Sequence, residues 1–550
     1  MMIDTKKLGH RWKGAYNINT TYAEGDVVRQ GDDVKKVNAD GTLSEFAQGQ
    51  QNIGSKGQVL TDTTEPVQGK TNQVLHSAAS GTDFKPQWRF TDERNGTKAV
   101  SLTDSRSKGH MKYYSGSDAV GAVMTDGTLR MIGNKRYGMG GVGDVNVSRG
   151  LAWVVPFPKG TYIVKAFNAP ANHLFAIDTK GQLWGAGYDV SGNGTNTVQP
   201  LMKNISQGGA MEGETIVDFE AQNDWYGYRS CFAIAASGKV YAWGRNHQGQ
   251  LGLGVSTDPV NTPTLVPMPD GIRINKVFTG GGYYTPTMMT DQNYDMWGCG
   301  YGLSYMGVNY SSNTFIKNTK FNNVGHMTFH ESDGHWATGS QYYRSSSITT
   351  RDGKLYIAEL NVSGQVHWGH LGSGDADEPT SEDVWLTGVK YAAVKNGGYD
   401  QVVALMNDGT IKARGYSPLS GTNTNTQVFT TWPQITDAVE MWGVGSRHGQ
   451  HVDILTARGT IWSVGYSNGD GRGTADQASA VLAAGTMKEV LHPYAFVDVT
   501  KAGYQYDGTN YHNTLGLDEY GDVYIWGSGQ LERGAGNDAE DMYVPTQIKF

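Results

Sequence analysis

The sequence predicts an all-β fold: a β-propeller of about eight four-stranded blades, preceded by a small β-rich N-terminal segment. One observation is a hairpin signature that recurs roughly every 56 residues from residue 101 to the C-terminus. The other is a composition with 75 glycines, 30 tyrosines and 14 tryptophans in 550 residues, which favours short strands and tight turns over helices. A repeat of this length holds four strands with their loops, which is one propeller blade.

Each repeat contains an apolar strand, a tight turn and a second apolar strand. Seven of the eight turns end in glycine, which adopts a positive φ without a Cβ clash, whereas the fourth has the pair Asp291-Gln292. The position six residues after the turn is again glycine in seven repeats, with Glu359 as the exception. The predicted structural turn glycines are Gly127, Gly181, Gly238, Gly353, Gly409, Gly459 and Gly521.

The two strands of each hairpin carry further regular positions. The residue two places after the turn is apolar in all eight repeats, as at Leu183 and Val240, and is expected to pack on the neighbouring blade. Small residues such as Ala176 and Ala233 in the middle of the first strand predict that this strand lies innermost, near the axis.

The third repeat is the clearest. It reads CFAIAASGKVYAWGRNHQGQLGLGVSTDPVNTPTLVPMP from Cys231 to Pro269, and its SGKVYAWGxNxxGQLGLG string resembles the regulator-of-chromosome-condensation repeat. That family usually has seven blades, so this ring has eight, or seven if a terminal unit is not a full blade. The last segment, YVPTQIKF, matches PTLVPMP of the third repeat and predicts a C-terminal strand that helps to close the ring.

The first hundred residues lack the repeat. Residues 1–55 are predicted to form a small β module, 56–100 an extended connector or anchor, and 101–550 the propeller. The segment RWKGAYNINTTYAEGDVV resembles small chitin-binding-type modules of bacteriophage tail fibres and glycosidases, and NQVLHSAASGTDFKPQWRF resembles a segment of phage virion proteins. Trp12, Tyr16 and Tyr22 occupy the sugar-stacking positions of such modules; the alternative is that they are core residues.

Composition and motifs exclude several classes of function. The net charge of −8 and the lack of a basic block argue against nucleic acid as a partner. The most apolar stretch, 151–164, is too short and too proline-broken to insert into a membrane. Cys231 and Cys299 are expected to be buried free thiols. There is no phosphate loop and no nucleophile–base order, so neither a cofactor nor an enzymatic activity is expected.

Two clusters of polar residues have the side-chain types that bind metal ions. His326, His330 and His335 lie near Glu331 and Asp333 and could hold a transition metal, but residues four apart on a strand sit far from each other, so a polar inter-blade segment and no metal are expected. Similarly, the acidic stretch 373–383 is expected to be a solvated loop rather than a calcium site.

Aromatic residues grouped in the loops are the candidate recognition sites. Tyrosine and tryptophan combine a large apolar surface with a polar group, which suits protein and sugar interfaces. Blade-to-blade packing is the competing interpretation for several of them. The candidates for surface recognition are Trp225, Tyr226, Tyr228, Tyr301, Tyr305, Tyr342 and Tyr343.

These resemblances lead to one functional hypothesis and two alternatives. The first is a non-enzymatic bacteriophage virion structural protein, made in the host cytoplasm and present in multiple copies. Its residues 1–100 would dock on other virion proteins, and its propeller loops would contact a host-surface glycan or protein. The alternatives are a cellular propeller scaffold of the guanine-nucleotide-exchange or chromatin type, and a carbohydrate-active enzyme with a targeting module.

Overall fold

The computed structural model describes two compact units, Met1–Val100 with Met124–Asp126, and Ser101–Val123 with Gly127–Phe550. Up to residue 91 it describes the backbone of separate strands only, and from residue 97 it describes most of the chain. The larger gaps after residue 97 are 105–110, 113–118, 144–151, 170–172, 188–191, 223–229, 281–285, 302–310, 333–342, 361–365, 368–383, 396–400, 416–425, 446–449, 467–480, 483–486, 507–508 and 528–541.

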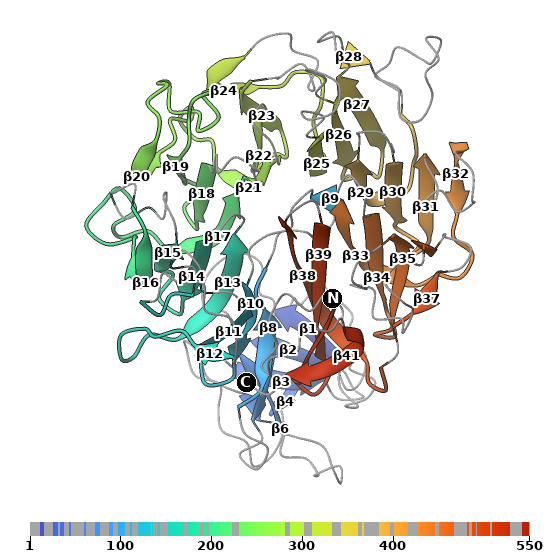
Figure 1. Cartoon of the computed structure of the whole chain (residues 1–550). Helices are drawn as coiled ribbons and strands as arrows, with labels where there is room; N and C mark the ends of the chain where they lie inside the picture. Colours follow the sequence, from blue (N-terminus) through green and yellow to red (C-terminus); the bar gives the residue numbers. More distant parts are fainter. Residues whose placement is uncertain are drawn as a thin grey trace. The chain divides into compact units, whose positions relative to one another are not determined.

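The larger unit is a ring of eight four-stranded blades, which confirms the all-β propeller and the count of eight (Figure 1). In chain order the blades are β8 (Ala99–Leu102), β10 (Ala119–Met124), β11 (Leu129–Gly133), β12 (Trp153–Val154); β13 (Ile163–Ala169), β14 (His173–Asp178), β15 (Leu183–Gly187), β16 (Gln199–Asn204); β17 (Ile216–Ala221), β18 (Ser230–Ala235), β19 (Val240–Gly244), β20 (Val260–Leu265); β21 (Ile274–Thr279), β22 (Thr287–Asp291), β23 (Met296–Gly300), β24 (Ser312–Lys317); β25 (Val324–Ser332), β26 (Tyr343–Thr350), β27 (Leu355–Leu360), β28 (Val366–His367); β29 (Val389–Lys395), β30 (Gln401–Met406), β31 (Ile411–Gly415), β32 (Thr426–Thr431); β33 (Ala438–Gly445), β34 (Gln450–Thr456), β35 (Ile461–Tyr466), β36 (Val481–Leu482); and β38 (Phe496–Tyr506), β39 (Thr509–Asp518), β40 (Val523–Gly527), β41 (Met542–Ile548).

Blade 7 carries two additional short strands. β37 (Lys488–Glu489) pairs with β35, and β9 (Met111–Lys112) pairs in parallel with β33. β9 comes from the segment between β8 and β10 of blade 1, so the chain crosses the ring to add a strand to another blade's inner edge (Figure 1). Its partners Gly443 and Val444 lie at the end of β33, away from the glycine turns.

The N-terminal unit contains two small sheets. Their strands are β1 (Arg11–Ala15), β2 (Asp26–Gln30), β3 (Asp33–Val37) and β4 (Leu43–Glu45) in one sheet, and β5 (Leu60–Thr61), β6 (Asn72–His76) and β7 (Gln87–Thr91) in the other. The division of this region at residue 55 stays a prediction. The described part of the chain has no helix with the length and apolarity that a bilayer crossing requires.

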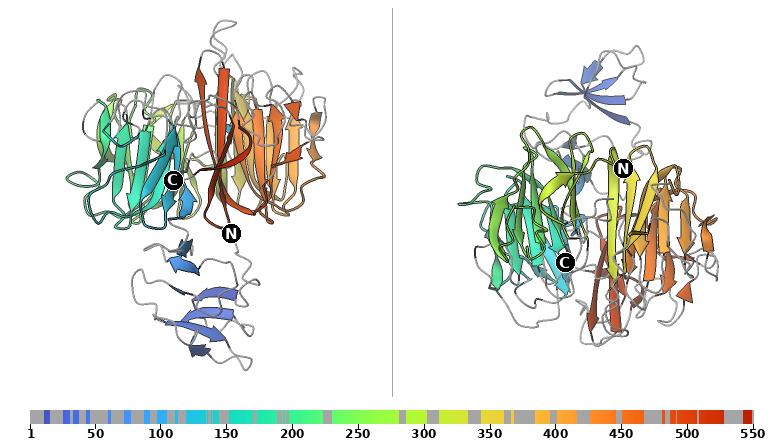
Figure 2. Two further views of the ribbon diagram at one scale, coloured as in Figure 1. Left: turned by 60° about the horizontal axis from the view of Figure 1, so that its bottom comes forward. Right: turned by 90° about the horizontal axis from the view of Figure 1, so that it is seen from above.

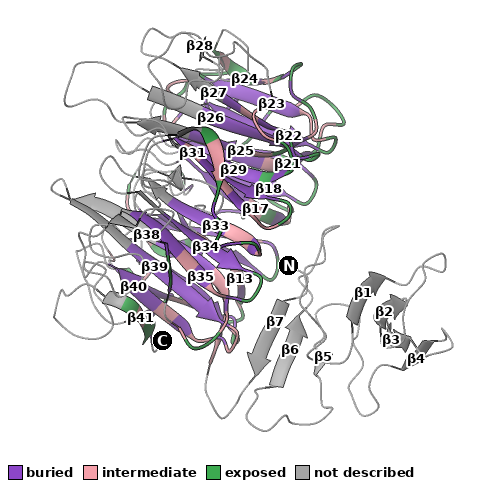
Figure 3. Cartoon of the chain, turned by 90° about the vertical axis from the view of Figure 1, so that its right-hand side faces the viewer, coloured by how far each residue is buried: buried purple, intermediate pink, exposed green. Residues whose placement is uncertain are grey.

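The first of the four strands is innermost in each blade, apart from the added β9 inside β33 in blade 7, and the fourth lies at the rim (Figure 1). Second and third strands such as β22 and β23 are buried on both faces, whereas outer strands such as β24 are largely accessible (Figure 3). The prediction that the alanine-bearing strand lies innermost is therefore wrong, because Ala176 and Ala233 belong to second strands. Pro200, Pro263 and Pro545 interrupt outer strands, where a missing N–H blunts an exposed edge.

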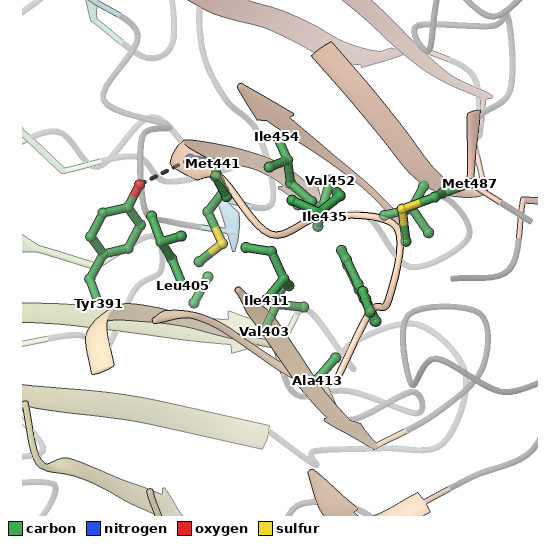
Figure 4. Packing of buried hydrophobic residues seen from close by; sticks show 14 residues of the cluster. Tyr391, Val403, Leu405, Ile411, Ala413, Ile435, Met441, Val452, Ile454 and Met487 are labelled. Carbon is green, nitrogen blue, oxygen red and sulfur yellow. Dashed lines mark hydrogen bonds between the residues drawn. The ribbon is translucent and has the colours of Figure 1, made fainter. Parts of the chain in front are cut away.

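The hydrophobic core is divided among the blade junctions. The cluster in Figure 4 joins residues of β29 to β31, such as Val403 and Leu405, with residues of β33 to β35, such as Ile454, and so lies between blades 6 and 7. The apolar residue two places after the turn contributes to such junctions, as predicted: Leu183 packs between blades 2 and 3, and Val240 packs between blades 3 and 4. Burial of these side chains holds neighbouring blades together.

The turn between the second and third strands has the same backbone in all eight blades. The seven turn glycines have φ between 71° and 85°. In blade 4 the residue with positive φ is Tyr294, at 63°, and its N–H donates to the carbonyl of Asp291 as that of Gly181 donates to Asp178. Alignment of the repeats in the sequence placed this turn at Gln292, two residues too early. A tyrosine, unlike a glycine, does not mark a residue with positive φ in the sequence.

Each turn also joins its blade to the next. At seven junctions the carbonyl of the turn residue accepts the N–H of the first residue of the following inner strand, at 2.8 to 3.0 Å. At the eighth junction, the N–H of Leu102 donates to a carboxylate oxygen of Asp498 at 3.4 Å. β41 pairs with β40 of its own blade, so the C-terminal segment completes blade 8 rather than exchanging into blade 1. In blade 8, β38 and β39 are the longest strands, with 11 and 10 residues, and they extend past their neighbours in the side view (Figure 2).

Three blades place an aspartate at the start of this turn. In blades 2 and 4, one oxygen of Asp178 or Asp291 accepts two backbone N–H groups, and the other accepts the indole N–H of Trp184 or Trp297 at 3.0 Å. In blade 8, Asp518 accepts the same two backbone bonds, but a tyrosine, Tyr524, replaces the tryptophan, so its buried Oδ2 receives no indole N–H. Burial raises the pKa of Asp518.

Asparagine substitution should therefore have opposite outcomes at equivalent positions. Asp291→Asn sets an amide NH₂ against the Trp297 indole N–H and should lower the free energy of unfolding by about 1–3 kcal/mol. Asp518→Asn loses no such bond and should cost less than about 1 kcal/mol. In the folded state, Asp518 keeps its proton at pH values above 3.8, where the same side chain in the unfolded chain loses it. The wild-type protein should therefore lose stability relative to Asp518→Asn as the pH rises from 3.8 to the raised pKa of the folded state. Chemical unfolding across this pH range measures both effects, and equal costs for the two variants would contradict the assignment.

Candidate interaction site on the inner strands

A β-bulge recurs at the start of the inner strands. In β13, β17, β21, β25, β29, β33 and β38 the pairing with the second strand shifts between the first and the third residue. The first residue is buried in all seven strands, and the bulge changes the direction in which the next side chains point. Because this end of the strand bonds to the preceding turn, the bulges lie at the end of the ring that carries the glycine turns, which we call the turn face.

The second and third residues of these strands form what we call the axial ring. All of them are half-buried or exposed except Tyr391, which is 9% exposed. The ring consists of Val164 and Lys165, Val217 and Asp218, Asn275 and Lys276, Gly325 and His326, Lys390 and Tyr391, Val439 and Glu440, and Val497 and Asp498.

Several ring contacts cross from one blade to the next. Lys165 Nζ of blade 2 lies 2.7 Å from Asp218 Oδ1 of blade 3, with the two side chains 39% and 27% exposed. Such a partly exposed pair adds little stability, so its main consequence is a fixed arrangement of charge. Lys390 Nζ of blade 6 donates to the carbonyl of Val439 in blade 7 at 2.7 Å. Within the ring, these contacts link blade 2 to blade 3 and blade 6 to blade 7.

His326 occupies the middle of one side of the ring. Its imidazole lies 5.1 Å from the ring centroid of Tyr391 and 6.0 Å from that of Phe278. Burial, and secondarily the charge of Lys276, hold the pKa of His326 well below its usual range, so the imidazole is neutral at physiological pH. The Tyr391 hydroxyl accepts the N–H of Met441 at 2.9 Å (Figure 4), and burial raises the pKa of this phenol.

Charge is unevenly distributed around the ring. Blades 4 to 6 contribute the basic side chains Lys276 and Lys390, with His326 between them. Blades 7 and 8 contribute the acidic Glu440 and Asp498. The arrangement presents fixed charges of both signs beside exposed valines, which suits recognition of a complementary surface; it offers no activated nucleophile.

Most predicted recognition residues fall outside the described residues. This holds for Trp225, Tyr226, Tyr228, Tyr305 and Tyr342, and of Tyr343 only the backbone in β26 is described. Tyr301 follows β23 and is 42% exposed. The strand ends on either side of these segments lie at the face opposite the turn face, whereas the axial ring lies at the turn face.

The remaining predicted positions are distributed as follows. Trp12 lies in β1 with only its backbone described, and Tyr16 and Tyr22 lie outside the described residues, so sugar stacking stays a prediction. His326 and His330 share β25, His335 lies outside the described residues, and no group of three or more His, Cys, Asp or Glu side chains suited to a metal occurs among the residues described. The acidic stretch 373–383 also lies outside them.

Both cysteines are buried, and neither forms a disulfide, as the sequence predicts. Burial raises the pKa of the Cys299 thiol well above its usual value, which keeps it protonated and unreactive. Its Sγ lies 3.3 Å from the carbonyl of Gln250, in the loop that carries the GQLGLG string. This loop is folded around Asn246, which bonds Leu251, Val255 and Asp258.

The axial ring was missed in the sequence. The sequence nevertheless contains a signal for it. A triplet of an apolar residue, any residue and, usually, a charged residue begins 29 to 37 residues after each of the first seven turns. Examples are Ile163-Val164-Lys165 and Phe496-Val497-Asp498. The triplet is too short to stand out until the turns have been aligned.

Comparison with known proteins agrees with the repeat assignment. Residues 237–285 match the regulator of chromosome condensation (RCC1) repeat. The ultraviolet-B receptor UVR8 of Arabidopsis thaliana is 24% identical over 275 residues, which cover 42% of this chain and 61% of the receptor. The human probable E3 ubiquitin-protein ligase HERC6 is 26% identical over 214 residues, which cover 38% of this chain and 19% of the ligase. The chain thus spans less than two thirds of the length of these curated relatives.

Two solved structures align with the chain at low identity. Prp20p from Saccharomyces cerevisiae, described with its binding to Gsp1p and histones, aligns with 82% of this chain and 90% of its own, at 17% identity and a TM-score of 0.44. Human WBSCR16 aligns with 64% of this chain and 88% of its own, at 14% identity and a TM-score of 0.42.

The matches correct the functional hypothesis drawn from the N-terminal segment. The curated relatives, an ultraviolet-B receptor of a plant and a probable ubiquitin-protein ligase of human, are cellular proteins, so the assignment to a bacteriophage virion is wrong. The short N-terminal motifs misled because polar, glycine-rich strand segments recur in unrelated proteins. Tail-fibre, virion-partner and host-glycan roles have no support from these comparisons, whereas the curated relatives favour the alternative of a cellular propeller scaffold.

Proposed function

We propose that this chain is a non-enzymatic, cellular scaffold that binds a partner protein on the turn face, through the axial ring. The observation that carries the proposal is the recurrence of one bulge in seven inner strands, which exposes charged and apolar side chains around a single axis. Loops and side chains can vary on this frame while blade packing keeps it rigid, which is the usual way a propeller serves recognition.

The charge pattern supports specific rather than general adhesion. Val217, Val439 and Val497 provide exposed or half-buried apolar surface, and Lys165, Asp218, Glu440 and Asp498 surround it with both signs of charge. Complementary charge steers association and rejects wrong partners, while burial of the valines would supply affinity. Ubiquitin-ligase activity is named for a relative that this chain covers only in part, and the ring by itself supports binding only.

The test is capture of partners with ring and rim variants. Val217→Glu with Glu440→Lys alters the ring, and Val428→Glu with Glu489→Lys makes the same exchanges, with the same change in net charge, on β32 and β37, outside the ring. Proteins recovered with the wild-type chain are identified by mass spectrometry, and the strongest is purified for direct binding. We expect the ring variant, still folded by circular dichroism, to lose this binding and the rim variant to keep it. Retention by the ring variant would refute the proposal.

A further inference from the structure

We infer that an aromatic cluster between blades 7 and 8 binds an arginine side chain of the partner protein. The inference rests on the proposed function and specifies the chemistry of the partner, because the cluster lies on the turn face next to the start of β38, which contributes to the axial ring. Its members, which we call the tyrosine patch, are His492, Tyr494, Tyr520 and Tyr524.

Two segments of the chain hold the tyrosine patch together. The first connects β37 to β38 and carries His492 and Tyr494, and the second is the turn of blade 8 and carries Tyr520. The N–H of Glu519 in this turn donates to the carbonyl of Ala495 at 2.8 Å, which joins the two segments. Nδ1 of His492 lies 3.0 Å from the carbonyl oxygen and 3.2 Å from the nitrogen of Tyr494. Side chains that are already ordered lose less conformational entropy when a ligand binds.

The patch extends the core of the blade junction to the surface. His492 packs on Phe496 and Tyr524, with ring centroids 4.3 and 4.1 Å apart. Tyr494 and Tyr520 contact each other with 5.0 Å between their centroids and 77° between their planes. Tyr494 nevertheless remains 48% exposed, and Tyr520 is half-buried. Packing within the chain therefore leaves aromatic surface for a partner.

The patch has a negative charge beside it and no cation on its rings. Burial, and after it the charge of Glu519, raise the pKa of the Tyr520 phenol, which therefore stays protonated at neutral pH. Among the residues that the structure describes, Glu519 forms no ion pair, and no lysine or arginine lies over a ring of the patch. A cation brought by the partner would meet both the negative faces of the rings and the carboxylate of Glu519.

Other aromatic residues of the chain show which cation suits such rings. The Arg351 guanidinium lies 3.8 Å from the centroid of Tyr294, and that of Arg414 lies 4.4 Å from the centroid of Trp385. The lysine contacts with rings are longer, at 4.8 to 6.0 Å. A guanidinium is planar and weakly hydrated, so it stacks on an aromatic face better than an ammonium group does. The partner's arginine would occupy on the patch the place that Arg351 occupies on Tyr294.

The experiment uses the full chain and labelled peptides of about ten residues that alternate Ser with Arg, Lys or Glu. Fluorescence anisotropy should show that the Arg peptide binds about two- to fivefold more tightly than the Lys peptide, and that the Glu peptide binds least. Tyr494→Leu with Tyr520→Leu removes both rings and should weaken the Arg peptide at least about fivefold. Tyr494→Phe with Tyr520→Phe keeps the rings and should stay within about twofold. Glu519→Gln should weaken the Arg peptide about two- to threefold.

The matched control is Tyr162→Leu. Tyr162 is another tyrosine on the turn face, 53% exposed, but it lies beside blade 1 and outside the patch. Its replacement should change binding of the Arg peptide by less than about twofold. If the leucine pair does not fold by circular dichroism, Glu519→Gln tests the site without removing a packed ring.

Several outcomes would overturn the inference. These are binding of the Lys or Glu peptide as tight as that of the Arg peptide, an equal loss in the Tyr162 variant, no loss in the leucine pair or in Glu519→Gln, or a loss in the phenylalanine pair as large as in the leucine pair. A partner that is lost with the Val217 and Glu440 variant but binds the leucine pair with unchanged affinity would leave the proposed function intact and refute the arginine site alone.

Discussion

Replacing Lys501 with methionine is expected to lower the free energy of unfolding by about 3–5 kcal/mol, because it leaves a buried carboxylate without its cation. Lys501 on β38 and Asp453 on β34 are both fully buried and form an ion pair between blades 7 and 8. Ser463 donates to the other oxygen of Asp453 at 2.6 Å, and Lys501 also donates to Thr514 at 3.1 Å. Burial lowers the pKa of Lys501, opposed by the charge of Asp453.

The double variant Lys501→Met with Asp453→Leu is the control. It removes both charges and fills the junction with apolar side chains, as occurs between blades 6 and 7 around Val403 and Met441. Most of the lost stability should return, because the cost of the single change is an unpaired buried charge rather than a lost attraction. Urea unfolding and hydrogen exchange of β38 measure the effect. A double variant as unstable as the single one would show that the pair contributes net stability.

Gly459→Ala is expected to cost about 2–5 kcal/mol and to loosen the same junction. Gly459 has φ of 81°, so a side chain there adds backbone strain of about 1–2 kcal/mol. A Cβ would also lie 2.5 Å from the Cβ of Ala495 and 2.9 Å from the carbonyl oxygen of Phe496, and overpacking of this kind costs about 1–3 kcal/mol. The backbone bond from Phe496 to the Gly459 carbonyl, 2.8 Å long, would have to shift.

Gly271→Ala separates these two contributions. Gly271 has the same φ of 81°, but a Cβ there has nothing within 4 Å. It should therefore cost only the strain, about 1–2 kcal/mol. Thermal unfolding of the two variants side by side measures the difference, and equal losses would show that contact with the next blade adds nothing at Gly459.

The repeat and its hairpins could be predicted because their chemistry is local. A turn needs positive φ at one residue, glycine provides it, and the apolar residue that follows at a fixed distance marks the blade junction. The register failed where this chemistry was absent, at Tyr294, whose ring lies under the guanidinium of Arg351. The N-terminal motifs misled for the opposite reason, since short polar patterns recur without a common function.

Eight blades of four strands, their hairpin turns and two buried thiols are thus properties that neighbouring residues along the chain specify. The tertiary structure decided which strand faces the axis, how Lys501 meets Asp453, and that seven bulges combine into one ring of charge. The physical reason is distance along the chain. Contacts across a blade junction join residues about fifty positions apart, and whether a charged side chain there is paired, buried or exposed depends on what the next blade places opposite it.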